Sequence, residues 1–231
     1  AVTGDLLSLV SPHGMEIRDA SGSLAGYRHE TYDHNALQEH LDTYLQHREE
    51  WATLDHDKPG LDGARTARTE CFAPRHLGVF QDTAVGRLPD EAVRVLGGPE
   101  RHEIRLRGVD ANTVELSLVL RNKPANRMPE AGFFHFVPAA ASGWRLRKLG
   151  LWNEAGNIVE QGGGQLHGVE AVAARVDRQT VTITTIDSAL VGPASSNFLR
   201  YERQKPAFDG IRFNLYNNKW GTNFPMWWEG S

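Results

Sequence analysis

The chain has 231 residues, of which 40% are hydrophobic, and its 25 basic and 29 acidic residues give a formal net charge of −4. This apolar fraction, with six tryptophans, can fill a sizeable core and excludes a disordered tail. The scattered basic residues form no stripe for nucleic acid, and no apolar run approaches the roughly 18–20 residues of a membrane span.

The single cysteine, Cys71, cannot form an internal disulfide. It is compatible with a reducing compartment, so a cytoplasmic location is favoured. The first residues, AVTGDLLSLVSPHG, lack the basic region of a signal peptide.

The N-terminal part, residues 4–33, has the pattern of strand, turn, strand, turn, strand. A helix is predicted over residues 35–51, because Leu37, Leu41, Tyr44 and Leu45 recur at helical spacing and Asp33 can cap its start. Residues 52–75 are polar and contain glycine, which predicts a long loop. A weaker helical pattern covers residues 89–96.

The rest of the chain predicts strands over residues 103–107, 113–121, 132–137, 165–176 and 180–187, which are rich in β-branched and aromatic residues. Turn clusters such as GVDAN, RNKPAN and VDRQ separate them. This spacing favours an antiparallel β-sandwich with a short helical insertion over an alternating α/β fold. No linker or repeat divides residues 1–231, so a single domain is predicted.

Aromatic and amide side chains are concentrated near the end of the sequence. Flat rings stack on the C–H face of a pyranose, while amides and indole N–H groups reach its hydroxyls. The alternative is that these rings close the core of a β-fold and the amides make turns. The sugar-binding interpretation nominates Tyr216, Asn217, Asn218, Trp220, Asn223, Trp227 and Trp228.

A second nominated group lies in the proline-bounded segment 122–136. Asn126, Arg127 and Glu130 lie in a turn that Pro124 and Pro129 make rigid, so they are candidates to orient a ligand or to contact another domain. The alternative for Arg127 and Glu130 is a surface ion pair of small energetic value. His135 and His167 lie in apolar strands and fit either buried structural histidines or general bases on a concave sheet.

Other catalytic motifs are weak. The histidines along the predicted helix lack an HExxH or CxxC partner, so no metal site is predicted. There is no GxSxG elbow, and GGGQ at residues 162–165 lacks the lysine of a phosphate loop.

Several blocks carry a family resemblance. They are NKPANRMPEAGFFHFVP (122–138), WRLRKLG (144–150), NIVEQGGGQLHGVEAV (157–172), TTIDSALVGP (184–193) and FNLYNNKWGTNFPMWW (213–228), with GYRHETYD (26–33) and DKPGLD (57–62) before them. Together they resemble an uncharacterised family that has been linked to glycoside hydrolase family 38, the retaining α-mannosidases.

The resemblance implies a split architecture. An N-terminal catalytic domain or subunit would hold zinc and the catalytic carboxylates, and this chain would be the C-terminal β-region, similar to the galactose-mutarotase supersandwich. No cofactor is therefore expected in this chain, and its expected partners are carbohydrate and the catalytic domain.

The predicted function is a β-sandwich domain of a carbohydrate-active enzyme, which supports the catalytic domain and lines its sugar-binding cleft. The isolated chain is not expected to be catalytic. One alternative is a mutarotase-like epimerase or lyase that uses His135 and His167 as acid and base, with Glu130 as third member. Another is a purely structural interaction domain.

Overall fold

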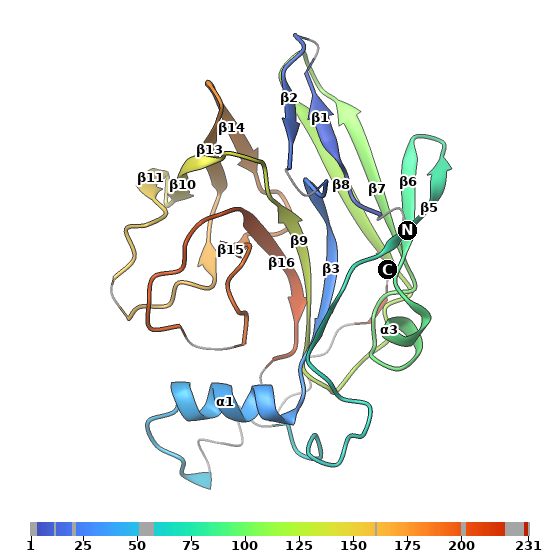
Figure 1. The fold of residues 1–231 in the computed structure, drawn as a ribbon, viewed down its shortest axis with the longest axis vertical. Coiled ribbons are helices and arrows are strands. Elements are labelled where there is room, and N and C mark those ends of the chain that lie inside the picture. Colours follow the sequence, from blue (N-terminus) through green and yellow to red (C-terminus); the bar gives the residue numbers. More distant parts are fainter. Residues whose placement is uncertain are drawn as a thin grey trace.

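The computed structural model describes residues 4–11, 13–19, 22–50, 58–159, 161–199, 202–219 and 229–230. Within these ranges the protein is mainly β, and all paired strands run antiparallel. The sheets pack on one another in a sandwich-like arrangement (Figure 1). The predicted mainly-β antiparallel fold is thereby confirmed.

The largest sheet, here called the central sheet, has the strand order β12-β15-β16-β9-β3-β4. These strands come from all parts of the sequence, so residues far apart in the chain become neighbours. Their bounds are β3 (Ala25–Thr31), β4 (Glu70–Phe72), β9 (Glu130–Phe136), β12 (His167–Gly168), β15 (Leu190–Pro193) and β16 (Ile211–Asn217).

Two four-stranded sheets flank the central sheet, one on each side in the view of Figure 1. The β7 sheet contains β5 (Arg75–Phe80), β6 (Thr83–Arg87), β7 (Arg101–Gly108) and β8 (Val114–Arg121). The β10 sheet contains β10 (Ser142–Lys148), β11 (Leu151–Glu154), β13 (Ala171–Val176) and β14 (Gln179–Thr184), and a separate hairpin pairs β1 (Ser8–Val10) with β2 (Glu16–Arg18).

The main core lies between these sheets. Phe134 and Phe213 from the central sheet pack in one cluster with Ile104 of β7 and with Trp144 and Val172 of the β10 sheet. Since side chains alternate along a strand, one face of the central sheet contributes side chains to this core and the opposite face does not. We call them the core face and the outer face.

Helix α1 (His34–Tyr44) lies across one end of the central sheet and covers part of the outer face (Figure 1). Leu37 of the helix, fully buried, packs with Phe133 of β9 and Phe198 in a second apolar cluster. The predicted cap is confirmed, because the Asp33 carboxylate accepts the backbone N–H of Ala36 at 2.8 Å. A short helix, α3 (Asp90–Arg94), confirms the weaker helical prediction.

Three predictions of element bounds were wrong. The helix predicted over residues 35–51 ends at Tyr44, since no apolar stripe follows Leu45, which is already extended. The predicted loop 52–75 contains β4, which the sheet pairing with β3 stabilises. The predicted strand 165–176 is two strands in different sheets, β12 in the central sheet and β13 in the β10 sheet. The three N-terminal strands β1, β2 and β3 were predicted correctly.

Candidate functional site

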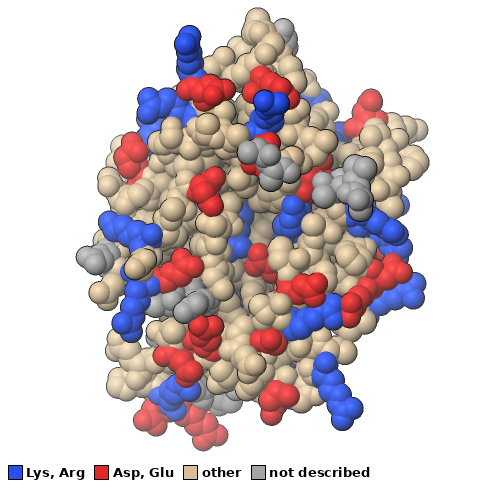
Figure 2. Space-filling view, in the orientation of Figure 1, with Lys and Arg blue, Asp and Glu red and all other residues tan. Residues whose placement is uncertain are grey.

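The outer face of the central sheet carries a polar pocket of about 340 Å³. Ligand sites in proteins commonly occupy about 300–1,000 Å³, so the pocket is large enough for a small molecule. Figure 2 shows a hollow near the middle of the viewed face, with basic and acidic side chains on its walls. The lining residues are Asp19, Ser23, Arg28, Glu30, Cys71, Phe133, His135, Val137, Ala194 and Arg212.

The strand register explains why these residues meet. Arg28 lies opposite Phe133, and Arg212 lies opposite His135, across adjacent strand pairs of the central sheet. Residues directly opposite one another in an antiparallel pair share a face. Glu30 lies opposite Cys71 on the other side of β3, so side chains from four strands face the same pocket.

Two arginines with carboxylate partners form the charged part of the pocket; the partner Glu30 also lines the pocket, whereas the partner Asp5 is fully buried outside its lining. Arg28 binds Asp5 in a bidentate manner, with N–O distances of 2.8 and 2.7 Å. Arg212 donates to Glu30 Oε1 at 2.9 Å and also to the carbonyl oxygen of Ser196. Each pair cancels its own charge, and the remaining charged lining residue is Asp19. The pocket therefore offers fixed donors and acceptors without a net positive charge.

The aromatic floor of the pocket is covered by a cation. The guanidinium carbon of Arg212 lies 4.3 Å from the centroid of the Phe133 ring, which is 1% exposed. A planar guanidinium stacked on a ring is held in one orientation, since the stacking and its hydrogen bonds act together. A ligand in this pocket would therefore contact the guanidinium of Arg212 and not the ring beneath it.

His135 is a neutral donor in this pocket. Burial, together with the charge of Arg28, lowers its pKa to about 4. Burial opposes ionisation of Asp5, yet hydrogen bonds and the charge of Arg28, with Ser23 and His135, hold the pKa of Asp5 below its ordinary value. Asp5 is thus an anion that accepts the Ser23 hydroxyl at 2.6 Å. Since that hydroxyl has one proton, His135 Nε2, 3.0 Å away, must donate to Ser23 Oγ.

This proton arrangement argues against a Ser–His nucleophile at Ser23. A histidine that donates to the serine oxygen cannot remove the serine proton in that geometry. The contacts at Ser23 are therefore hydrogen bonds that do not activate its hydroxyl group.

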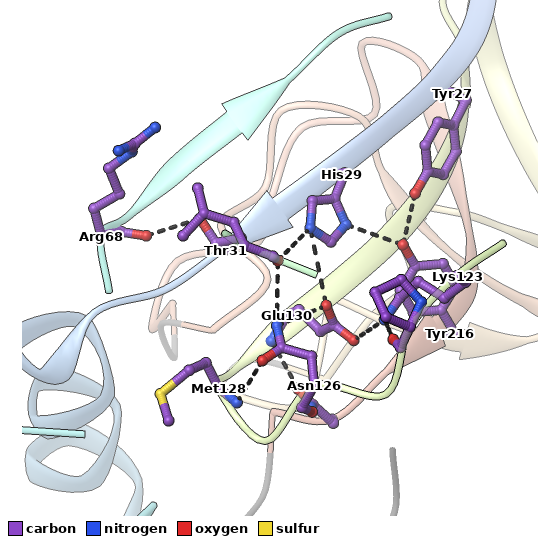
Figure 3. A network of polar contacts seen from close by, with 12 residues as sticks. Tyr27, His29, Thr31, Arg68, Lys123, Asn126, Met128, Glu130 and Tyr216 are labelled. Carbon is purple, nitrogen blue, oxygen red and sulfur yellow. Dashed lines mark hydrogen bonds and ion pairs between the residues drawn. The ribbon is translucent and has the colours of Figure 1, made fainter. Parts of the chain in front are cut away.

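A second polar cluster lies on the core face, at the start of β9 (Figure 3). Glu130, only 1% exposed, accepts Lys123 Nζ at 2.5 Å and Asn126 Nδ2 at 3.0 Å. Lys123 is also buried, donates to the carbonyl oxygen of Pro124 at 2.7 Å, and lies over the ring of Tyr216 at 5.3 Å.

A chain of hydrogen bonds borders this pair. His29 Nε2 donates to the carbonyl oxygen of Leu96 at 3.1 Å, so its Nδ1 accepts from the Tyr216 hydroxyl at 3.0 Å. Tyr27 in turn donates to the Tyr216 hydroxyl at 2.6 Å. Burial, with a contribution from the charge of Lys123, lowers the pKa of His29 to about 4, so the ring is neutral.

Four of the nominated residues come together in this second cluster. Asn126, Glu130, Tyr216 and Asn218 all contact one another directly or through one neighbour. Their polar groups bind other parts of the protein, which fits the structural alternative for them. The fifth described residue near them, Asn217, donates to Asn214 Oδ1 at 2.8 Å.

The alternative of a surface ion pair between Arg127 and Glu130 is not what the structure shows. Arg127 is exposed, whereas Glu130 is buried and has Lys123 as its ion-pair partner. Lys123 and Arg127 are both close to Glu130 in the sequence, and only the fold of the loop determines which of the two side chains is buried beside it.

The three residues of the predicted acid–base set do not meet. Glu130 and His135 lie on opposite faces of β9, because an odd number of positions separates them. His167 belongs to β12, three strands away from β9 in the sheet order, and accepts from Lys148 Nζ at 3.1 Å. Burial and the charge of Lys148 lower the pKa of His167.

The nominated residues Trp220, Asn223, Trp227 and Trp228 lie outside the described residues. The sugar-stacking role of the three tryptophans therefore stays a prediction.

Sequence reasoning missed the charged residues of the outer-face pocket. Arg28 and Glu30 are two positions apart in GYRHETYD, and this spacing puts both on one face of a strand. This shared face could have been predicted from the sequence. The pairing of Arg212 with Glu30 could not have been predicted, since it joins strands that are distant in the sequence.

Within the described ranges, no group of three or more His, Cys, Asp or Glu side chains is placed to hold a metal ion. None of the helices in those ranges has the length and apolar character needed to cross a membrane. Comparison with protein-family models, with curated proteins and with solved structures found no match to this chain.

Proposed function

We propose that this chain is a β-sandwich domain of a carbohydrate-active enzyme and that its outer-face pocket binds the hydroxyl groups of a sugar. The observation that carries the proposal is that Arg28, Arg212 and Glu30 line a pocket of about 340 Å³ with both arginines charge-compensated, Arg212 by Glu30 and Arg28 by the buried Asp5.

The chemistry of the pocket fits hydroxyl groups. A sugar hydroxyl both donates and accepts, so it can bind a carboxylate oxygen and a guanidinium N–H at the same time. Both partners are present and already oriented, which lowers the entropy cost of binding. An anionic ligand gains less, because the two arginines are already neutralised and Asp19 adds a negative charge.

The resemblance of the sequence to the family linked to glycoside hydrolase family 38 supports the same proposal. In that architecture the domain is a galactose-mutarotase-like supersandwich that supports a zinc-dependent catalytic domain and forms one wall of its cleft. The chain's own contribution is then positioning of the sugar, and the catalytic domain supplies the bond-breaking chemistry.

A binding titration tests this function. We expect the chain to bind one or more neutral monosaccharides with a dissociation constant in the millimolar range, corresponding to about −4 kcal/mol. The measurement is a two-dimensional NMR titration with a panel of hexoses, which detects weak binding directly.

Ala194→Trp fills the pocket from its rim, because Ala194 lines it and is partly exposed. This variant should lose binding at least tenfold. The matched control, Thr180→Trp, places the same ring on an exposed position of β14 and should leave binding unchanged. Absence of binding to every sugar in the panel would reject the proposed function, and equal binding by both variants would reject the pocket.

A further inference from the structure

The β7 sheet presents one face to the main core and the other to solvent. Ile104 and His102 of β7 are buried on the core side. Arg101, Arg105 and Arg107 alternate with them along the strand and are exposed. Since side chains alternate along a strand, these arginines lie on the solvent side of the sheet.

The strand register brings four arginines into one row across this side. Arg75 of β5 lies directly opposite Arg87 of β6. Arg101 of β7 lies directly opposite Arg121 of β8, and the register of β6 with β7 places Arg87 beside Arg101. Residues opposite one another share a face, and neighbouring strands lie about 4.8 Å apart, so the row spans roughly 14 Å. These arginines are far apart in the sequence, and only the pairing of the strands gathers them.

The row is an arrangement that does not favour the stability of the sheet. Like charges directly opposite one another in an antiparallel pair are destabilising. The same side of the sheet also carries Arg105 and Arg107, against Glu103 and Glu115. This surface, which we call the arginine face, thus has six arginines and two glutamates, whereas the whole chain has a net charge of −4.

Carboxylates of the chain already bind part of the row. Glu103 accepts from Arg121 Nε at 3.2 Å and from Arg121 Nη2 at 3.0 Å, and its Oε1 lies 3.1 Å from Arg101 Nη2. Arg87 lies 3.0 Å from the carboxylate of Asp90, at the start of α3. The geometry of the row therefore fits carboxylate groups, which guanidinium groups bind through paired N–H donors.

Two members of the row retain capacity for a further anion. Arg75 is exposed and has no ion-pair partner in the part of the chain that the structure describes. The side chain of Arg101 is 50% exposed and shares the carboxylate of Glu103 with Arg121. An additional carboxylate bound here would also reduce the repulsion within the row.

An apolar strip borders the arginine face on β5, the edge strand of the β7 sheet. Leu77, Val79 and Phe80 are 47%, 64% and 63% exposed. Phe80 lies opposite Thr83, which lies opposite Arg105, so its ring is on the arginine face. Single exposed hydrophobic residues are normal, but three within four positions form a patch. Arginine together with aromatic side chains is the composition enriched in protein–protein interfaces.

We propose that the arginine face and the apolar strip of β5 together dock an acidic segment of a partner protein. Carboxylates of the segment bind the row of arginines, and its apolar side chains cover Phe80 and the neighbouring residues. None of the residues that line the outer-face pocket belongs to this surface, so the inference does not depend on sugar binding.

The apolar strip favours a protein segment over other polyanions. A single nucleic acid strand is held by aromatic side chains interleaved with cations, and the row of four arginines contains no ring. An acidic polysaccharide would use the arginines but has no apolar side chains to cover Leu77 and Val79. A protein segment uses both parts of the surface.

Binding of a labelled peptide to the full chain tests this surface. The probe is the fluorescein-labelled peptide EELEEFEE, and its binding is measured by fluorescence anisotropy at low ionic strength. Two reference peptides separate the contributions, since QQLQQFQQ lacks the carboxylates and EESEESEE lacks the apolar side chains. We expect EELEEFEE to bind at least about tenfold more tightly than either reference peptide.

The double variant Arg75→Gln, Arg101→Gln tests the row. It removes two charges, so EELEEFEE should bind about tenfold more weakly, while the thermal midpoint should stay the same or rise because repulsion within the row falls. The matched control is Arg175→Gln, Arg178→Gln, which makes the same charge change at exposed positions at the end of β13 and should leave binding unchanged. Equal binding by the two double variants would overturn the proposal.

Phe80→Ser tests the apolar strip separately, and it remains informative if the arginine variant fails to fold. It should weaken the binding of EELEEFEE about fivefold and leave that of EESEESEE unchanged. Leu149→Ser, at a position that is 96% exposed before β11, is the matched control and should change neither. A single-stranded oligonucleotide or an oligogalacturonate of the same charge that displaces EELEEFEE as well as the unlabelled peptide does would contradict a protein partner.

Discussion

Individual residues show how a β-protein holds charge on both faces of one sheet. On the outer face, Arg28 and Arg212 each have a carboxylate partner, of which Asp5 is fully buried and Glu30 is partly exposed. On the core face, Lys123 and Glu130 form a pair that is almost fully buried. Burying such a pair gives little net stability, because desolvation offsets the attraction, but removing one member leaves an uncompensated charge.

Lys123→Met should therefore destabilise the protein by about 3 kcal/mol at pH 8, where Glu130 is ionised. At pH 6 the loss should be smaller, because Glu130 can then take up a proton. Urea denaturation at the two pH values measures both losses. The double variant with Glu130→Gln should lose less than Lys123→Met alone at pH 8, and a larger loss in the double variant would disprove this account of the pair.

His135 predicts a pH dependence of the opposite sign. Its folded-state pKa of about 4 lies below the ordinary 6.5, so its contribution to stability is present above pH 6.5 and is lost as the pH falls toward 4. Relative to His135→Gln, the unmodified protein should lose on the order of 1–2 kcal/mol between pH 7 and pH 5. If the free energy of unfolding changed equally between pH 7 and pH 5 in the two proteins, the result would be inconsistent with a neutral, buried His135.

At the scale of elements, local patterns in the sequence predicted those structures that local interactions determine. Asp33 was identified as the cap of α1, the third predicted N-terminal strand corresponds to β3, and the predicted strand 132–137 corresponds to β9 with a shift of one or two residues at its ends. The wrong predictions concern elements whose bounds depend on tertiary contacts. The break between β12 and β13 depends on which sheets are nearby, and β4 exists because β3 offers it a partner.

The cap of α1 gives a test at this scale. Asp33→Ala should cost about 1 kcal/mol, because the N–H of Ala36 loses its acceptor. Asp33→Asn should retain most of the stability, since asparagine caps helices about equally well. Thermal denaturation of the three proteins measures the difference, and an Asn variant as unstable as the Ala variant would show that charge, and not the cap bond, is important.

For the whole molecule, the types of residue in the candidate site could be predicted from the sequence, but their positions in the fold could be predicted only in part. The segment 122–136 was singled out from the sequence, and its residues Asn126 and Glu130 gather with Tyr216 and Asn218 in the structure. They meet inside the protein, because Glu130 starts β9 on its core face, and one-dimensional patterns do not show which face is covered. The pocket needed the register of four strands, β3, β4, β9 and β16, which the sequence alone does not supply.

The central claim is that a sugar occupies the outer-face pocket, and Cys71 offers the most direct test. It is the single cysteine of the chain, it is exposed, and it lines the pocket. Neighbouring side chains partly desolvate its thiol and, together with the nearby charge of Glu30, raise the pKa of the thiol to about 11, so alkylation is slow enough to follow by mass spectrometry. A sugar at ten times its dissociation constant should slow the reaction about tenfold.

The control is a Cys71→Ser chain with Thr180→Cys on β14, whose alkylation should not respond to sugar. We expect the sugars that bind in the titration to slow the alkylation of Cys71 and to leave the alkylation of the control cysteine unchanged. A sugar that binds the protein and leaves the alkylation rate of Cys71 unchanged would contradict it.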